Sequence, residues 1–520
     1  MPNPPKPVLP AYAVATSGLA PVKRRLRLTN LRLCRLVTAR MVMAGLVLAG
    51  LVVPGIVIAG LPTTGIAQAS AQPTGHAAEP TAAAVQASAH ACGPTNIANG
   101  APWPEFGGNN SHSQIATGTT AAGALRRHWE TAQLDGAMYG EPLVGGGCVY
   151  VATENNSIYA FSAATGAFVW RTHIARPVTS GLACSGDISP SGISGTPVLD
   201  ATSDELWAVV FTDISGRPEH EIVALDAQTG HVMRRQELSL PGTDPTAEQQ
   251  RAALDLDRGN VYVALGGLYG DCGNYKGGIV SVPENSARGL GYWSTPTKRE
   301  GAVWEVGGPA VLPDGDLLFA TGNSAASPGQ PFDGGDAVIN LTGGLHMSSY
   351  FAPTQWAHWN LSDQDMGTSG PAILPGGLVL QVGKPGEGFL MAISHLGGIG
   401  RQLAALQVCT NGGAYGADAV AGATVYVPCS NGIVAVAVKG HSLRVLWRSS
   451  VGGAGSVLVA GGRVFEQVQG GQLFAVNTAN GRALQTLSLS APTTHFPWVV
   501  AVGTTLYAAD GTKLEAFAGA

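Results

Sequence analysis

Apolar and polar residues alternate with a period of two in short runs from about residue 103 to the C-terminus. Each copy of the pattern opens with a Gly-x-Pro-like step. A short apolar strand, a Gly-rich turn, a Val-Tyr-Val-type strand, another turn and an Ala-rich third strand follow. This period places one face of each strand in a sheet-on-sheet interface, and Asn-Gly and Thr-Gly pairs suit tight turns. Helical periodicity is absent, so the pattern predicts an all-β fold.

The pattern recurs eight times. Each copy is anchored on one apolar residue of its second strand: Val149, Leu206, Val261, Leu317, Leu378, Val425, Val464 and Leu506. Propeller blades of about 40 to 45 residues, some enlarged by loops, have this rhythm. Radial stacking also explains how about 400 residues fold together, because a single core stops growing near 250 to 300 residues. We therefore predict an eight-bladed β-propeller of four-stranded antiparallel blades.

The last blade lacks a strand of its own. The eighth copy ends at Ala520 before any fourth strand, whereas the segment from Leu125 to Gln133 has the form of that strand. Its Trp129 corresponds to Trp170 and Trp447, which end two other blades. Pairing this N-terminal strand with the last blade would close the ring and hide an unpaired edge.

Seven cations between Lys23 and Arg40 precede the apolar run from Met41 to Leu61. Positive charge on the N-terminal side only keeps that side in the cytoplasm. Residues 1–69 therefore read as an export signal or membrane helix, and the chain after about residue 70 is expected to be extracytoplasmic. The run is long enough to span a bilayer, but Ala67-Gln68-Ala69 has the form of a cleavage site. Cleavage and anchoring both remain open.

Composition completes the domain division and excludes one class of partner. Residues 70–102 are rich in Ala, Thr and Pro without periodicity and read as a flexible linker, which leaves residues 103–520 for the propeller. Only 12% of the residues are charged, and the net charge is -5. Such a chain has no basic field that could neutralise a run of phosphates, so nucleic acid is not an expected partner.

Removing Cys34 with the N-terminal segment leaves six of the seven cysteines, an even number that suits an oxidising compartment. Cys409 and Cys429 flank one Gly-rich turn and one strand-like stretch, so we predict that they pair within a single sheet. The other four, Cys92, Cys148, Cys184 and Cys272, allow three connectivities, or some of them stay free thiols.

The repeats carry a family resemblance. Phrases such as VYVATENNSIYAFSAATGAFVW and IVALDAQTG look like the repeats of pyrroloquinoline-quinone (PQQ)-binding-like β-propellers, and WPEFGG at residues 103–108 resembles their usual opening. That family includes quinoprotein alcohol dehydrogenases and also propellers without enzymatic role, such as the outer-membrane assembly-factor type. Function must therefore be argued from the site.

Two stretches resemble the dehydrogenases more specifically. Residues 301–323 are similar to the stretch whose Trp lies beneath the quinone and whose last Asn binds calcium, which implies Trp304 as the floor and Asn323 as a calcium ligand. Residues 362–393 are similar to the stretch with the catalytic aspartate and a quinone-contacting lysine. This match implies Asp365 as general base and Lys384 as the cation on the quinone oxygen.

The chain also departs from the dehydrogenases. No two cysteines are adjacent, and no CxxCH haem motif occurs. Tyr139 stands where they have a quinone-binding glutamate, Cys272 lies at or near their calcium-binding glutamate, and Gln364 replaces the tryptophan before the catalytic aspartate. Asp271 is the one nearby residue that could substitute as a metal ligand. His358, the histidine nearest Asp365, is expected in a loop.

Two functions follow. The first is an exported, non-catalytic scaffold of the cell envelope that binds a protein or small ligand through the loops enlarged between Gly166 and Leu378. The alternative is a PQQ- and calcium-dependent quinoprotein dehydrogenase of small alcohols or sugars that uses Trp304, Asn323, Asp365 and Lys384. Because half of the expected cofactor contacts are missing, the sequence favours the first and leans against an enzyme.

Overall fold

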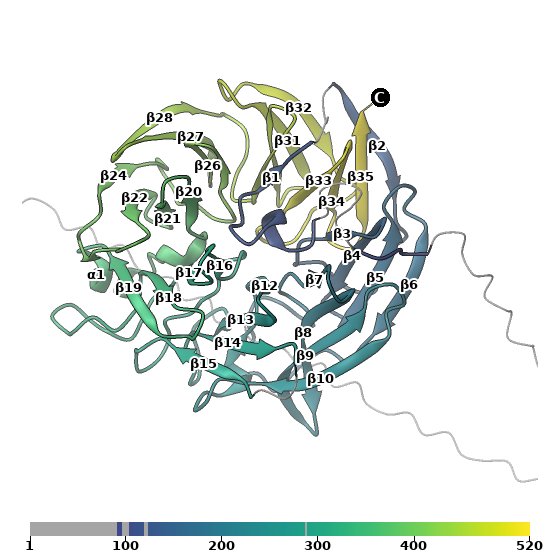
Figure 1. The fold of residues 1–520 in the computed structure, drawn as a ribbon, viewed down its shortest axis with the longest axis horizontal. Coiled ribbons are helices and arrows are strands. Elements are labelled where there is room, and N and C mark those ends of the chain that lie inside the picture. The colour runs from purple at the N-terminus through teal and green to yellow at the C-terminus, as the bar shows by residue number, and fades with distance from the viewer. Residues whose placement is uncertain (1–90, 96–102, 119–122, 286–288, 520) are drawn as a thin grey trace, which may run out of the picture. The chain divides into compact units, whose positions relative to one another are not determined.

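The computed structural model describes residues 91–95, 103–118, 123–285 and 289–519. Their strands form eight sheets that ring one axis (Figure 1). Five sheets have four strands, and three gain a short fifth strand. Each of the eight predicted anchor residues lies in the second strand of its own sheet. The prediction of an eight-bladed β-propeller is therefore confirmed.

The first four blades use the strands of residues 143–399. Blade 1 is β3 (Leu143–Gly145), β4 (Cys148–Thr153), β5 (Ser157–Ser162) and β6 (Phe168–His173). Blade 2 is β7 (Val198–Asp200), β8 (Glu205–Ile214), β9 (Arg217–Asp226) and β10 (Val232–Leu238). Blade 3 is β12 (Asp255–Asp257), β13 (Asn260–Gly267), β14 (Gly278–Pro283) and β15 (Gly291–Ser294), with β11 (Glu248–Gln249) beside β13. Blade 4 is β16 (Ala310–Val311), β17 (Leu317–Ala320), β18 (Val338–Leu341) and β19 (Met347–Ala352), with β23 (Gly398–Ile399) beside β19.

The other four blades complete the ring. Blade 5 is β20 (Ala372–Leu374), β21 (Leu378–Val382), β22 (Glu387–Ala392) and β24 (Ala404–Gln407). Blade 6 is β25 (Ala419–Ala421), β26 (Thr424–Cys429), β27 (Gly432–Lys439) and β28 (Ser442–Arg448). Blade 7 is β29 (Val457–Ala460), β30 (Arg463–Val468), β31 (Gln472–Asn477) and β32 (Ala483–Ser488), with β1 (Ile115–Ala116) beside β29. Blade 8 is β33 (Val499–Val502), β34 (Thr505–Ala509), β35 (Leu514–Gly519) and β2 (Leu125–Glu130).

Tryptophans on the outer strands fasten neighbouring blades together. Trp170 of β6 donates its indole N–H to the carbonyl of Ala227 at 3.1 Å, and its ring covers Gly230 of blade 2. Gly230 has φ +74°, and a Cβ there would lie 2.5 Å from the ring, so only glycine fits this contact. Trp447 repeats the arrangement with Gly481 of blade 7.

The ring closes where the sequence predicts. β2 pairs antiparallel with β35, with Leu125 opposite Gly519 and Glu130 opposite Glu515. Trp129 then lies against Gly166 of blade 1, as the other two tryptophans do on their own neighbours. The N-terminal strand is therefore the outermost strand of the last blade and leaves no open edge at the junction.

The segment that precedes this strand, residues 103–116, packs into the hub of the ring. It makes backbone hydrogen bonds with the first strands of blades 1, 2, 4, 6 and 7, through Val144, Leu199, Val311, Val420 and Val459. Phe106, in the short 3-10 helix η2 (Phe106–Gly108), is 2% exposed and packs with Ala253, Val306 and Ala417. The axis is thus filled with side chains.

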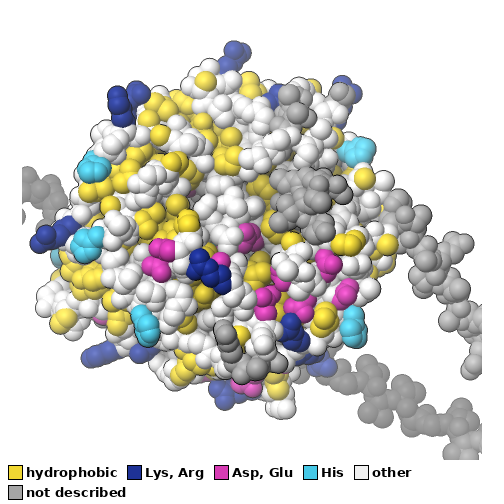
Figure 2. Space-filling view, in the orientation of Figure 1, with side chains coloured by type: hydrophobic (Ala, Val, Ile, Leu, Met, Phe, Trp, Pro, Cys, Tyr) yellow, Lys and Arg dark blue, Asp and Glu magenta, His cyan; other side chains and the backbone are white. Residues whose placement is uncertain are grey.

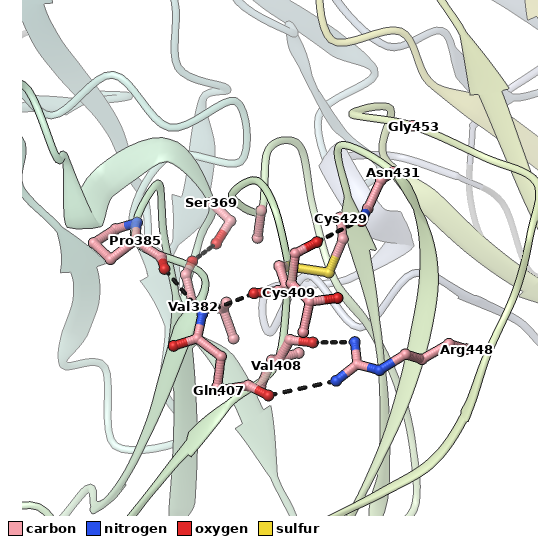
Figure 3. The surroundings of a disulfide bond; sticks show 12 residues. Ser369, Val382, Pro385, Gln407, Val408, Cys409, Cys429, Asn431, Arg448 and Gly453 are labelled. Atoms are coloured by element: carbon pink, nitrogen blue, oxygen red, sulfur yellow. Dashed lines mark hydrogen bonds between the residues drawn. A yellow bond between two sulfur atoms is a disulfide. The ribbon is translucent and has the colours of Figure 1, made fainter.

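Three disulfides lie in the described residues: Cys92–Cys148, Cys184–Cys272 and Cys409–Cys429. Cys409 and Cys429 do pair, but their predicted place within one sheet is wrong. Cys409 follows β24 of blade 5 and Cys429 ends β26 of blade 6, so the Gly-rich turn between them connects two blades rather than two paired strands (Figure 3).

The structure describes one part of the predicted linker of residues 70–102, namely residues 91–95. Cys92 and Thr95 are fixed to blades 1 and 2, by the disulfide to Cys148 and by hydrogen bonds to Asp204. The chain is therefore attached to the propeller before residue 103. Residues 1–69 and most of the predicted linker lie outside the described residues.

The described residues contain one α-helix, α1 (Trp356–Ser362). His358 lies in it, so the expectation of a loop at this position is wrong. The helix begins after the N-cap residue Gln355, in the long connection from blade 4 to blade 5. No helix in the described residues has the length and apolar character needed to cross a bilayer.

Candidate functional site

Four candidate residues lie in loops that end on one face of the ring. In an antiparallel blade, the turn between the second and third strands and the connection to the next blade fall at the same end. Trp304 lies in the connection between β15 and β16, and Asn323 follows β17. Asp365 lies between α1 and the 3-10 helix η4 (Met366–Thr368), and Lys384 follows β21. We call Trp304, Asn323, Asp365 and Lys384 the quartet.

The structure brings the whole quartet together. The Nζ of Lys384 lies 2.5 Å from Oδ2 of Asp365 and 5.9 Å from the ring centre of Trp304. The backbone N–H of Asn323 donates to Oδ1 of Asp365 at 2.8 Å. Gly322 permits this approach, because a Cβ there would lie 2.6 Å from Oδ1 of Asp365 and 2.9 Å from the indole nitrogen of Trp304.

Asp363 is a member of the site that sequence reasoning missed. Its Oδ1 accepts from the Nζ of Lys384 at 2.7 Å and from the amide of Asn323 at 3.1 Å. Asp363 is the C-cap residue that follows α1, in the left-handed conformation with φ 53° and ψ 47°, which aspartate tolerates better than most residues. The signal in the sequence that could have identified Asp363 was its spacing of two residues from Asp365.

Lys384, Asp363 and Asp365 form an ion cluster, and the buried carboxyl of Asp336 interacts with it through its charge. Burial raises the pKa of Asp365, although Lys384 opposes the shift. Burial also disfavours the charged form of Asp363, but the hydrogen bond and charge of Lys384 outweigh it and lower the pKa of that carboxyl. Desolvation disfavours the Lys384 cation, but the two carboxylates raise its pKa overall. One ammonium is therefore held between two acids.

Calcium does not fit the groups that are present. It takes six to eight oxygen ligands, and the described residues hold no group of three or more His, Cys, Asp or Glu that could bind a metal. Oδ1 of Asn323 is buried without a partner, but the nearby carboxylates already surround Lys384. Cys272 is in a disulfide, and Asp271 accepts the hydroxyl of Tyr275 at 2.5 Å.

The quinone contacts that the resemblance implies are also incomplete. The ring of Phe496 lies 6.3 Å from that of Trp304, tilted by 48°, so a protein side chain already packs beside the proposed floor. Tyr139 carries the guanidinium of Arg251 over its ring at 5.4 Å instead of presenting a carboxylate. Within the described residues, Gln364 donates hydrogen bonds to the carbonyls of Trp359 and Ser362, at the end of its own helix.

Residues 490–498, between β32 and β33, form a strap over the hub. Phe496 contacts Trp304 and stacks on Tyr415, with ring centres 5.8 Å apart and an interplanar angle of 7°. His495 lies 3.4 Å from Asp187 and accepts from Arg251 through its carbonyl. Charged side chains gather near the centre of the ring in the space-filling view (Figure 2). Two of the cations on these loops are Lys384, which pairs with Asp363 and Asp365, and Arg251, which donates to the carbonyl of His495.

The eight blades and the converging loops define a β-propeller of PQQ-like repeats. The family model described as outer membrane protein assembly factor BamB matches residues 117–326 and 356–518, and the chain belongs to this family. One curated relative, outer membrane protein assembly factor BamB of Burkholderia pseudomallei (strain K96243), is 26% identical over 201 residues. The match covers 35% of this chain and 49% of that protein, so the chain spans about half the length of this relative.

Solved structures share the fold at low sequence identity. Quinohemoprotein alcohol dehydrogenase from Comamonas testosteroni is 14% identical with a TM-score of 0.63, covering 81% of each chain. A europium-containing methanol dehydrogenase is 14% identical with a TM-score of 0.59, covering 80% of this chain and 98% of its own. BamB from Moraxella catarrhalis is 12% identical with a TM-score of 0.53, covering 76% and 100%. These similarities establish the fold alone.

Proposed function

We propose that this chain is a non-catalytic, extracytoplasmic propeller of the cell envelope that binds a partner protein through the loop face around its hub. One observation carries the proposal: the Nζ of Lys384 lies between the carboxylates of Asp363 and Asp365, at 2.7 and 2.5 Å. The protein's own cation thus already pairs with the acids that the dehydrogenase reading would use as base and metal neighbours. Membership of a family named for outer membrane protein assembly supports a role with protein partners.

Export is part of the same proposal. Three disulfides in the described residues suit an oxidising compartment. The cationic stretch and apolar run of residues 23–61 supply the signal, either cleaved or kept as an anchor. Detection of the mature N-terminus by mass spectrometry of the envelope fraction distinguishes the two forms, and recovery of the whole chain in the cytosol with reduced cysteines would contradict export.

The partner surface is marked by two exposed apolar side chains on the loop face. Tyr269, in the connection from β13 to β14, is 72% exposed, and Leu361, in α1, is 67% exposed. Loops on a rigid scaffold often carry binding function, so these two exposed side chains are the ones we propose as partner contacts. Phe168 is 56% exposed but lies on β6, at the outer rim of blade 1, and provides a matched control.

The test uses crosslinking of the full chain in envelopes of the source cells. Tyr269→Ser with Leu361→Ser is expected to lose the crosslinked partner, whereas Phe168→Ser keeps it. A partner retained by the double variant, or lost equally in the control, would contradict the loop-face assignment. Circular dichroism of the purified variants verifies that the blades remain folded.

A second candidate is a quinoprotein dehydrogenase, favoured by the convergence of the quartet. Bound PQQ would supply a hydride acceptor, with Trp304 beneath it and Lys384 at its oxygen. Asp365 would need to release Lys384 before it could accept a proton from an alcohol. Purified protein supplied with PQQ, calcium and an artificial electron acceptor should show alcohol oxidation under this reading and none under the scaffold proposal.

A further inference from the structure

Blade 2 carries a hairpin that is longer than the corresponding hairpin of blade 1. β8 and β9 have ten residues each and stay paired as far as Ile214 opposite Arg217, whereas β4 and β5 have six residues each. The turn residues Ser215 and Gly216 both have positive φ, at 56° and 88°, and Oδ1 of Asp213 accepts the N–H of Gly216 at 2.6 Å. This is the geometry of a tight two-residue turn, so the hairpin ends in a fixed tip.

A cavity of about 620 Å³ lies between this hairpin and the connection from blade 1 to blade 2. Cavities of this volume are typical of sites for small molecules. The two walls are fastened together, because Thr212 of β8 forms a β-bridge with Pro177 and its hydroxyl donates to the carbonyl of Arg176 at 2.7 Å. None of the residues that line the cavity belongs to the quartet or to the strap at residues 490–498.

The cavity contains two cations, Arg176 and Arg235, and they differ in their partners. Arg235 forms an ion pair with Glu221 and donates to the carbonyl of Ile174 at 3.3 Å. Within the described residues, the guanidinium of Arg176 makes no hydrogen bond, and no carboxylate lies within 4.0 Å of it. A guanidinium presents a planar fork of donors that matches a carboxylate through two parallel hydrogen bonds. Arg176 is therefore the group that would receive an anionic ligand.

The other polar groups of the cavity suit hydroxyls. Asp213 uses Oδ1 for the N–H of Gly216, and Glu221 uses Oε2 for Arg235. Among the described residues, the second oxygen of each carboxylate and the hydroxyl of Ser215 have no hydrogen-bond partner. Carboxylate oxygens accept hydrogen bonds from ligand hydroxyls, and the charges of these two acids disfavour a second anionic group on the ligand. The ligand should therefore have one carboxylate and several hydroxyls.

We propose that this cavity binds a monoanionic sugar acid, with the ligand carboxylate on Arg176 and its hydroxyls on Asp213, Glu221 and Ser215. The apolar side chains of Ala175 and Ile214 line the same cavity and can contact the carbon skeleton. The proposal goes beyond the scaffold function and does not depend on it, because it concerns a small molecule beside blade 2.

The experiment is calorimetric titration of the full chain with glucuronate, and with glucose and acetate as the two halves of its chemistry, at equal ionic strength. We expect saturable glucuronate binding with a dissociation constant on the order of 1 mM, and binding of glucose and acetate that is at least about tenfold weaker. Arg176→Gln should weaken glucuronate binding at least about tenfold, because it removes a charge-assisted pair. Asp213→Asn keeps an oxygen for Gly216 but loses an acceptor, and should weaken binding by a smaller factor.

Arg217→Gln is the matched control. Arg217 lies on the same hairpin and pairs with Glu219 at 3.0 Å, but it does not line the cavity. This variant should bind glucuronate as the wild type does. Circular dichroism verifies that each variant is folded.

Three outcomes overturn the proposal: no glucuronate binding by the wild type, binding that Arg176→Gln leaves unchanged, or acetate binding as tight as that of glucuronate. The last result would mean a site for any small anion. The crosslinking experiment at Tyr269 and Leu361 concerns residues outside this cavity, so failure of either proposal leaves the other intact.

Discussion

Two cations face the hub of this propeller, and their surroundings differ. Lys384 is held by Asp363 and Asp365 at 2.7 and 2.5 Å, whereas Arg251 has no ion-pair partner among the described residues. The first is neutralised within the fold and acts as a structural tie between blades 4 and 5. The second keeps its charge without a partner. The difference shows that residues matching a catalytic motif can be paired with one another, while an arginine on the same face has no ion-pair partner among the described residues.

The largest effect on stability is expected from a substitution of Lys384. Lys384→Met leaves the buried carboxylate of Asp365, 7% exposed, without its cation. Loss of one partner from a buried ion pair costs about 3–5 kcal/mol. Urea denaturation should show this loss, and adding Asp365→Asn should restore most of it. If Lys384→Met left the free energy of unfolding unchanged, the ion cluster would not be a structural tie.

The disulfide beside Lys384 should come next. Cys409–Cys429 joins blades 5 and 6 (Figure 3). Gly413, between the two cysteines, packs against the backbone of Lys384, where a Cβ would lie 2.5 Å from the Lys384 Cα. Replacing both cysteines by Ser is expected to cost about 3 kcal/mol, measured by denaturant unfolding under oxidising conditions. Adding reductant to the wild type breaks all three disulfides and should cost more than this, whereas the double-Ser variant should lose only the contribution of the other two. An equal response of both would assign the loss to the other two disulfides.

The surroundings of Arg251 predict a pH-dependent stability. Burial raises the pKa of Glu154, which acts on Arg251 through its charge, to about 7. The folded state then binds the proton more tightly than the unfolded state, so this contribution is present at low pH and is lost as pH rises towards 7. From pH 5 to pH 7 the wild type should lose on the order of 2 kcal/mol relative to Glu154→Gln. A parallel pH dependence of the two proteins would contradict this role of Glu154.

The smallest effect is expected at Arg251 itself. Arg251→Met removes a desolvated cation that makes one long hydrogen bond, so the free energy of unfolding should change by less than about 1 kcal/mol or rise. The contrast with Lys384→Met, measured in the same urea series, is the direct comparison of the two cations. A loss as large as that of Lys384→Met would mean that Arg251 is also a structural tie.

The fold was accessible from the sequence because period-two alternation and repeat spacing are local signals. The anchors Val149 to Leu506 fall on second strands, and the strand at Leu125 closes the ring. The sheet assignment of Cys409 and Cys429 failed because a turn between blades and a turn within a blade have the same Gly-rich composition.

The sequence predicts only some of the residues of the candidate site. The quartet came from motif similarity, and its members do meet. Asp363 depended on how α1 ends, which no periodicity encodes. Arg251 had no signal, because its burial results from loops more than 200 residues apart in the chain, such as that of His495, at a sequence separation of 244. Long-range packing of irregular segments is the information that a strand pattern lacks.

The central claim is that the protein's own lysine closes the hub and leaves no quinone site. Equilibrium titration of the purified full chain with PQQ and calcium tests it most directly. The account predicts no saturable binding for the wild type. Saturable, calcium-dependent binding that Lys384→Ala abolishes would contradict it and would establish the dehydrogenase reading of the quartet.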